Sequence, residues 1–332
     1  MPGLGTLADA PAVARILHAA TGEDPDELRL VGQGVTTIGW RADTARGSYA
    51  VLVERPPEAR DARARNEPTQ YAARQAILEA LAERGARSPR PVATARTIES
   101  RDPVDGRWDW MVTTWTEGEP PLDAIADEAA RDLGRELALL HGLPVEGFGR
   151  LADEADRIRG LAPDRAAGIL SRWAPEAWPY DGRALLSHPI VGVAPQLVTT
   201  IAALRSGLMR FAEEPTQVAV CHTDLNASHL RVVDGRLSGL IDFGDAAIVP
   251  PGFDLASFAY YFGWPALERL LEGYTSNSIL REIRLAEAHQ LAVVLALQKV
   301  EKHRGNEKRL AQAVAFLEET LPLAVRRDQR GL

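Results

Sequence analysis

VAVCHTDLNASHLRVVDGRLSGLIDFGDAAIVPPGFDLA, residues 218–256, is the most informative stretch of this 332-residue chain. VAVC predicts a short buried strand that ends at His222-Thr223-Asp224. LRVVDGRLSGLI predicts a β-hairpin with its turn at Asp234-Gly235, and the acidic segment DFGD, which starts at Asp242, follows directly on the second strand. Carboxylates are therefore expected at strand ends that face one place.

Phosphoryl transfer is a reaction that needs such a set of acids, because it depends on positioning and charge neutralisation more than on covalent help from the protein. One carboxylate accepts the hydroxyl proton, and others hold Mg²⁺, which prefers oxygen ligands and bridges phosphates. Asp224 fits the base and Asp242 the metal ligand, and Asp242 comes 18 positions after Asp224, which leaves room for a hairpin between them. In the alternative interpretation, Asp224 and Asp242 only cap turns. That interpretation does not explain why they occur in a fixed order with His222, Phe243 and Asp254.

The first part of the chain predicts a small β-rich lobe, residues 1–116. A chain of 332 residues suits two lobes, since single cores stop growing at about 250–300 residues. A short amphipathic helix is expected over 9–20 and one main helix within 66–85. Between and after them, five β-favouring runs predict an antiparallel sheet: LRLVGQG, TIGWRADT, SYAVLVE, PRPVATAR and WDWMVTTWTEGE.

Residues 117–332 predict a larger, mainly helical lobe. DEAARDLGRELALLHGL has its leucines on one helical face, and an insertion over about 150–216 contains helices near 164–173 and 196–213. Helices are also expected over 253–274, 280–302 and 307–321, with the middle one buried. The predicted fold class is α+β, with an N-terminal antiparallel sheet lobe and a helical C-terminal lobe.

Composition excludes several classes of partner. The net charge is −8, and the sequence has no cluster of Lys and Arg that could bind along a phosphate backbone. We therefore expect no nucleic acid partner. The N-terminus lacks a basic start followed by an apolar run, and no stretch reaches the roughly 18 apolar residues of a membrane span; we expect no membrane partner and a cytoplasmic location. The single cysteine, Cys221, predicts a small buried residue. A monomer or weak dimer is expected.

HTDLNASHL, IDFGDA and PPGFDLA together resemble the aminoglycoside phosphotransferase family, which is related to the protein kinases. That family shows HGD, Asn five residues after the Asp, D-[FW]-x-[DE], and D-P-x-x-D-L-A. LGRELALLHGLPVEGFG and MVTTWTEGE are similar to further family segments, so that about three-quarters of the chain fits the pattern.

The resemblance implies a two-lobed protein-kinase-like fold and a set of site residues. Asp224 is the catalytic base, Asp242 a Mg²⁺ ligand, and His222 and Asp254 orient the catalytic loop. The backbones of Thr114 and Thr116 are expected to bind the nucleobase of ATP or GTP.

Departures from the pattern concern the nucleotide and the metal. His229 stands where most members carry the Asn that binds a second Mg²⁺. A His at this position is similar to the macrolide and aminoglycoside 2''-phosphotransferases, two branches that include GTP users. Thr223 replaces a Gly. Leu52 falls where a third-strand Lys or Arg reaches the phosphates, and Glu67, its expected helix partner, is left without that cation. Arg55 or Arg41 is the alternative cation.

The predicted function is nucleotide-dependent O-phosphorylation of a small-molecule hydroxyl, with an antibiotic as acceptor. Residues 150–216 contain 8 acidic and 8 basic residues, which favours a largely apolar macrolide over a polycationic aminoglycoside. Trp173, Trp178 and Tyr180 either line a pocket or, as we favour, pack the insertion. The alternatives are a kinase of an endogenous metabolite and a non-catalytic kinase-like nucleotide-binding module. For His141, a favourable interaction with the helix dipole is a sufficient explanation.

Overall fold

A computed structural model describes residues 8–60, 68–98, 104, 108–122, 124–173, 178–213 and 217–328. The chain divides into two compact units. The first comprises Met1–Glu117 with Asp153–Arg157, and the second comprises Gly118–Ala152 with Ile158–Leu332. The assignment of nucleotide binding to the first unit and of acceptor binding to the second stays a prediction.

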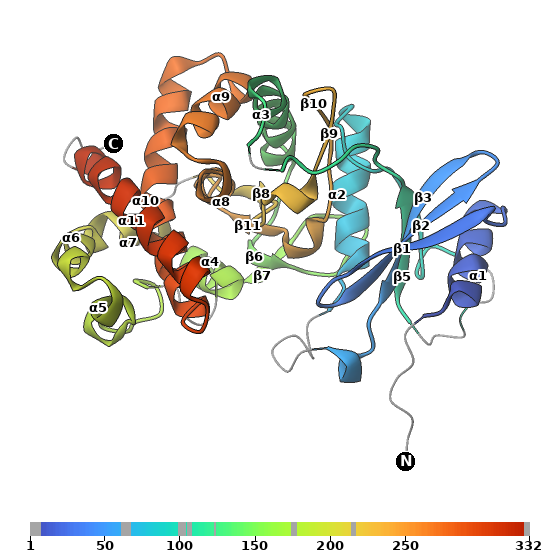
Figure 1. The fold of residues 1–332 in the computed structure, drawn as a ribbon, viewed down its shortest axis with the longest axis horizontal. Helices are drawn as coiled ribbons and strands as arrows, with labels where there is room; N and C mark the ends of the chain where they lie inside the picture. Colours follow the sequence, from blue (N-terminus) through green and yellow to red (C-terminus); the bar gives the residue numbers. More distant parts are fainter. Residues whose placement is uncertain are drawn as a thin grey trace. The chain divides into compact units, whose positions relative to one another are not determined.

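An antiparallel sheet with the strand order β1-β2-β3-β5-β4 forms the centre of the first unit. Its strands are β1 (Glu27–Gln33), β2 (Thr37–Thr44), β3 (Gly47–Glu54), β4 (Pro91–Thr94) and β5 (Trp110–Thr114). Helix α1 (Ala10–Thr21) begins at Asp9, whose carboxylate accepts the Ala12 N–H, and ends at Gly22 in the left-handed conformation. Ile16 and Leu17 of α1 belong to the same buried cluster as Val51 of β3, so the helix covers one face of the sheet (Figure 1).

Helix α2 (Tyr71–Glu83) begins later than the sequence predicts. Pro68 lies ahead of the helix, because Gln70 has a φ of 55° and breaks the helical geometry. The first amides of α2 are capped from far along the chain. The Asp153 carboxylate accepts the N–H groups of Ala72 and Ala73 at 2.9 and 3.3 Å, a partner that no local pattern reveals.

In the second unit, a small sheet and a hairpin hold the motif segments. The sheet has the order β7-β6-β11-β8 and consists of β6 (Phe148–Leu151), β7 (Gly160–Ala162), β8 (Ala219–Cys221) and β11 (Ala247–Val249). The hairpin of β9 (Leu230–Val233) and β10 (Arg236–Leu240) turns at Asp234 and Gly235, which have φ of 50° and 72°. The predictions of β8 and of the hairpin are confirmed. β6, β7 and β11 were not predicted, because three or four residues carry too little periodicity.

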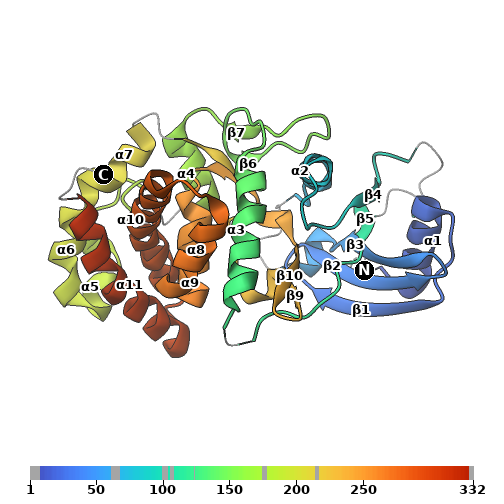
Figure 2. The ribbon, with the colours of Figure 1, turned by 90° about the horizontal axis from the view of Figure 1, so that it is seen from above.

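Helices make up most of the second unit. They are α3 (Asp127–His141), α4 (Arg165–Trp173), α5 (Ile190–Val193), α6 (Val198–Ala203), α7 (Arg205–Glu213), α8 (Gly252–Phe262), α9 (Trp264–Tyr274), α10 (Ser278–Lys302) and α11 (Glu307–Asp328). The single helix predicted over 253–274 is wrong: Gly263, at φ 83°, separates α8 from α9. The helix predicted over 196–213 divides into α6 and α7 at Leu204. Residues 291–297 of α10 are buried as predicted, and α10 packs against α8, α9 and α11 (Figure 2).

The fold class is therefore the predicted one, a mixed α/β chain with an N-terminal antiparallel sheet and a mainly helical C-terminal unit. None of the described helices is long and apolar enough to cross a membrane. Asp132 of α3 is fully buried and accepts hydrogen bonds from Arg236 at 2.6 and 2.8 Å. This pair ties the hairpin that precedes Asp242 to helix α3.

Helices α3 and α9 approach each other through glycines. A Cβ added to Gly134 of α3 would collide with the backbone carbonyl of Leu270, and one added to Gly273 of α9 would collide with that of Arg131. Backbone atoms cannot move aside as a flexible side chain can, so both positions require glycine for this crossing.

We expect Gly134→Ala to lower the free energy of unfolding by about 1–3 kcal/mol, because the added methyl group has to push two helix backbones apart. Gly192→Ala on α5 is the matched control, since a Cβ there meets no atom within 4 Å, and its effect should stay within about 0.5 kcal/mol. Urea denaturation of both variants measures the difference. Equal stability of the two variants would contradict the crossing described here.

Candidate functional site

The Asp254 carboxylate organises the segment after β8. Asp254 lies on α8 and is 0% exposed. Its Oδ2 accepts the backbone N–H of His222 at 2.8 Å, and its Oδ1 accepts that of Thr223 at 2.6 Å. A buried carboxylate is costly unless it is hydrogen-bonded, so these two bonds hold the backbone just before Asp224 in one position.

Thr223 takes a left-handed backbone conformation with φ 66°. This region is costly for a β-branched residue and easy for the Gly that the family pattern has here. The structure compensates with the Asp254 bond and with a second one, from the Thr223 hydroxyl to the Asp245 carbonyl at 2.6 Å. Thr223 therefore takes the place of glycine by adding a hydrogen bond that glycine cannot make.

The His222 ring supports Asp224 from the other side. Its Nε2 lies 2.8 Å from the Ile241 carbonyl oxygen, which can only accept, so Nε2 carries the proton. Nδ1 then accepts the Asp224 backbone N–H at 3.4 Å. Burial lowers the pKa of His222, which keeps this ring neutral. His222 thus contacts the Asp224 backbone and leaves the Asp224 carboxylate available.

His229 lies between the two acids that the sequence singles out. Its Nδ1 donates to the Asp224 backbone carbonyl at 2.8 Å and lies 3.6 Å from the Asp224 carboxylate. Its Nε2 lies 3.5 Å from Oδ2 of Asp242. Asp242 has a left-handed φ of 63° at the end of the hairpin, and its side chain is 52% exposed. The structure therefore brings Asp224, His229 and Asp242 together.

A buried hydrogen-bonded chain continues from Asp254 into the helices. His141, the last residue of α3, donates from Nε2 to Asp254 Oδ2 at 3.1 Å, and its Nδ1 accepts the Tyr274 hydroxyl at 3.1 Å. Arg284 of α10 acts electrostatically on Tyr274 and donates to the Glu287 carboxylate at 2.7 Å and to the Gln217 side-chain oxygen. Because the Asp254 carboxylate accepts, Nε2 of His141 carries the proton, and Nδ1 of the neutral ring accepts the Tyr274 hydroxyl.

His141 was missed as a supporting residue, and the helix-dipole explanation offered for it was incomplete. The signal was present as the Leu-His pair at the end of an amphipathic helix. Its partner Asp254 lies 113 residues further on, and only the fold brings the two together. Cys221 is fully buried as predicted, with its thiol 3.5 Å from the Val249 carbonyl.

The remaining predicted site residues belong to the first unit. Thr114 ends β5, where its N–H donates to the Arg90 carbonyl at 2.9 Å and its carbonyl accepts the Thr113 hydroxyl at 3.2 Å. Thr116 follows the strand and is half-buried. Leu52 pairs with Gly39 and Met111 inside the sheet. Glu67 lies outside the described residues. The proposed roles of Thr114 and Thr116 stay predictions.

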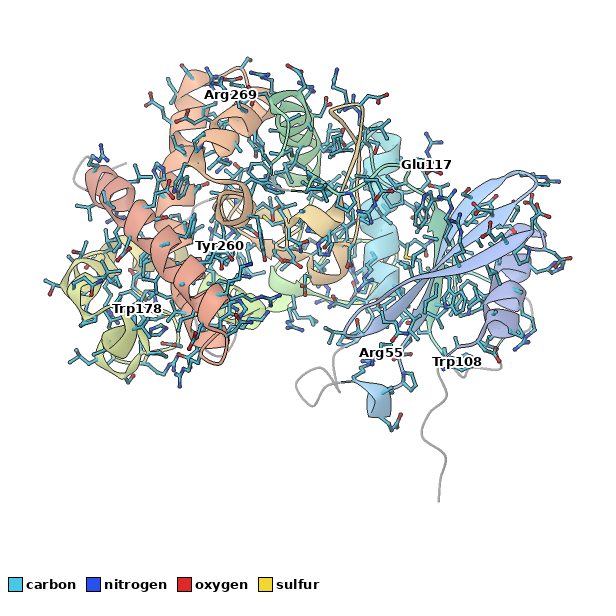
Figure 3. All side chains as sticks on the ribbon, in the orientation of Figure 1. Arg55, Trp108, Glu117, Trp178, Tyr260 and Arg269 are labelled. Carbon is cyan, nitrogen blue, oxygen red and sulfur yellow. The ribbon has the colours of Figure 1, made fainter. Side chains whose placement is uncertain are left out.

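Two of the aromatic residues of the insertion pack into its interior. Trp178 (Figure 3) is 2% exposed. Tyr180 is 8% exposed, and its hydroxyl donates to the Leu208 carbonyl at 2.7 Å. Both side chains therefore stabilise the insertion, as we favoured. The side chain of Trp173 lies outside the described part of the chain.

The fold and the motif segments described above are those of the protein-kinase-like phosphotransferases. The sequence profile of the phosphotransferase enzyme family matches residues 27–289. The chain belongs to this family.

Solved structures share the fold at low sequence identity. An aminoglycoside phosphotransferase, solved as a ternary complex with ADP and hygromycin B, superimposes with a TM-score of 0.62 at 14% identity and covers 94% of this chain and 98% of its own. A macrolide 2'-phosphotransferase from Brachybacterium faecium gives 0.52 at 19% identity, with 91% and 95% covered. At such identities the likeness concerns the fold.

A homoserine kinase of Xanthobacter autotrophicus is 30% identical over 226 residues, which are 68% of this chain and 61% of that kinase. The matched part of the chain thus spans about three-fifths of the length of this curated relative.

We expect Tyr274→Phe to lower the free energy of unfolding by about 1–2 kcal/mol, because it leaves His141 Nδ1 without the hydroxyl that it accepts. Tyr261→Phe is the control, since that hydroxyl lies 3.4 Å from the Lys299 ammonium at the surface. Chemical denaturation of both variants checks this. An unchanged stability of Tyr274→Phe would show that the chain of bonds from Asp254 ends at His141.

Proposed function

We propose that this protein transfers the γ-phosphate of a nucleoside triphosphate to a hydroxyl group of a small molecule, with Asp224 as the base. The observation that carries the proposal is that hydrogen bonds fix the backbone at Asp224 while its carboxylate stays accessible. Asp254 and His222 fix the backbone on either side of Thr223, while the Asp224 side chain keeps 29% of its surface exposed. A rigid backbone that carries an accessible carboxylate is what a general base requires.

In this proposal the Asp224 carboxylate accepts the proton of the acceptor hydroxyl as the hydroxyl oxygen attacks the γ-phosphorus. The bond from phosphorus to the bridging oxygen of the nucleoside diphosphate breaks. His229 holds the Asp224 main-chain carbonyl through Nδ1. Asp254, His222 and His141 position the loop and do not touch the reacting atoms.

The arrangement of His229 and Asp242 fits a divalent cation. Nδ1 of His229 donates to a carbonyl, so in the neutral form of the ring Nε2 presents a lone pair to the Asp242 carboxylate 3.5 Å away. Two acceptors facing each other need a proton or a cation between them. Asp242 and His229 would hold Mg²⁺, with the Asp224 carboxylate beside them. Mg²⁺ supplies charge neutralisation at the phosphates when bound.

An antibiotic is the acceptor class that we favour. The balanced charge of the insertion, 8 acidic against 8 basic residues over 150–216, suits a largely apolar acceptor such as a macrolide, and the fold is shared with macrolide and aminoglycoside phosphotransferases. A metabolite acceptor is the second candidate. It is favoured by the 30% identity to a homoserine kinase, which exceeds the identity to either structure.

We expect Asp224→Asn to reduce acceptor-dependent release of nucleoside diphosphate by about 10²–10⁴-fold, the usual contribution of a general base. Asp234→Asn is the matched control: it is the same change at the exposed hairpin turn, where φ is 50° and Asn accepts the left-handed conformation. The purified protein is assayed with ATP and GTP against a macrolide, an aminoglycoside and homoserine.

Full turnover by Asp224→Asn would contradict the assignment of the base. If the unaltered protein binds nucleotide and yet phosphorylates none of a broad panel of antibiotic and metabolite hydroxyls, the non-catalytic nucleotide-binding alternative holds instead.

A further inference from the structure

Arg74 is a buried cation in helix α2 that lacks an anionic partner among the described residues. It is 7% exposed, and its Nε has no hydrogen-bond partner in the described part of the chain. The contact that its guanidinium makes there is with the Tyr71 ring, at 5.2 Å from the ring centroid. Burial of an uncompensated charge is among the most destabilising features that a protein can carry. Such a residue points to an anionic ligand.

The surroundings of Arg74 contain acids, but these are engaged elsewhere. Glu54 and Asp109 both act electrostatically on Tyr71. Glu54 is bound by Arg60 at 2.5 Å and by the Asp109 N–H at 3.1 Å. Asp109 accepts the Thr69 hydroxyl at 2.7 Å. Neither carboxylate therefore makes a direct ion pair with Arg74.

Tyr71 connects Arg74 to the glycine-containing turn between β1 and β2. The Tyr71 hydroxyl lies 3.2 Å from the Thr37 hydroxyl, at the first residue of β2. Gly32 lies near the end of β1 and Gly34 in the turn; a Cβ on Gly32 would meet no atom within 4 Å, and one on Gly34 would lie 3.3 Å from the Thr37 carbonyl oxygen. A glycine in the turn and one at the end of the strand before it allow close approach of the backbone to a ligand. Hydroxyl and amide groups near a buried arginine suit phosphate.

The other cations considered for the phosphates are already bound. Arg41 donates to Asp43 at 2.9 Å and to Glu117 at 3.3 Å, and it stacks on Trp115. Arg55 (Figure 3) donates to the backbone carbonyls of Gly34 and Ala59 at 2.7 and 2.5 Å. Arg55 thus braces the glycine turn. Leu52, which lies where the family pattern has a cation, carries no charge at all.

We propose that Arg74 binds the polyphosphate of the nucleotide and supplies from helix α2 the positive charge that Leu52 of β3 lacks. The proposal rests on the proposed function only in naming a nucleotide as the carrier of the phosphates. The binding energy comes from charge-assisted hydrogen bonds between the guanidinium and phosphate oxygens.

Arg74→Met and Arg74→Lys test this proposal. The readout is the dissociation constant of adenosine divided by that of ATP with Mg²⁺, measured by calorimetry on the full chain. The same ratio is measured for guanosine and GTP. We expect Arg74→Met to reduce the ratio at least about tenfold, the usual size of a lost charged hydrogen bond, with nucleoside binding unchanged. Arg74→Lys keeps the charge and should retain part of the ratio. Inorganic tripolyphosphate serves as a further ligand: it distinguishes a nucleotide site from a site for free phosphate.

Stability provides an independent readout. Met matches the length of the Arg stem, so Arg74→Met opens no large cavity. It removes a buried charge that has no ion-pair partner in the described part of the chain, and the ligand-free protein should melt at the same or a higher temperature. A purely structural role for Arg74 predicts a lower melting temperature and an unchanged binding ratio. Arg46→Met is the control, since Arg46 pairs with Glu23 and its side chain is 80% exposed.

Any of three results would overturn the proposal. In the first, Arg74→Met keeps the ratio of the unaltered protein. In the second, Arg41→Met and not Arg74→Met reduces it. In the third, the unaltered protein binds ATP and GTP no more tightly than the nucleosides. Failure of the proposed function gives a different pattern. In that case the unaltered chain binds triphosphate through Arg74 but transfers phosphate to no acceptor.

Discussion

One buried carboxylate holds the proposed active site in place. Asp254 is inaccessible to solvent and receives two backbone amides and the His141 imidazole. Each bond compensates part of the cost of burying the charge, so the carboxylate and its donors can exist only together. The amides belong to His222 and Thr223, directly before Asp224. The left-handed conformation of Thr223 is a consequence of this demand, and it sets the direction in which the chain leaves toward Asp224.

The helical part of the second unit supports this carboxylate. Gly134 and Gly273 allow α3 and α9 to cross with their backbones in contact, and the C-terminal ends of the same two helices carry His141 and Tyr274, which are hydrogen-bonded to each other. Arg284 of α10, itself buried, acts electrostatically on Tyr274. Helix packing and site geometry are therefore one problem, because a shift of α3 relative to α9 would move the imidazole that supports Asp254.

Local patterns predicted most of the fold. The strands of the first sheet, β8, the hairpin at Asp234-Gly235 and helix α10 follow from β-branched runs, turn residues and periodicity. Errors arose where distant residues or single glycines decide: Asp153 caps α2 from outside it, and Gly263 divides one predicted helix into two. In the site, the ordered acids predicted that Asp224 and Asp242 would meet, and His229 does bring them together. The chain of hydrogen bonds through His141 depends on the fold, and so does the burial of Arg74 without an ion-pair partner among the described residues. A single sequence reveals neither.

Asp254→Asn tests the central claim, that this carboxylate positions the proposed base, most directly. The amide has the same shape, but one acceptor oxygen becomes a donor, so it cannot receive all three groups that Asp254 receives. We expect kcat, measured with an acceptor that the unaltered protein phosphorylates, to fall at least about a hundredfold. The KM values for nucleotide and acceptor should change little. Asp254→Asn with wild-type turnover would contradict the account, because Asp224 would then reach its working position without the carboxylate.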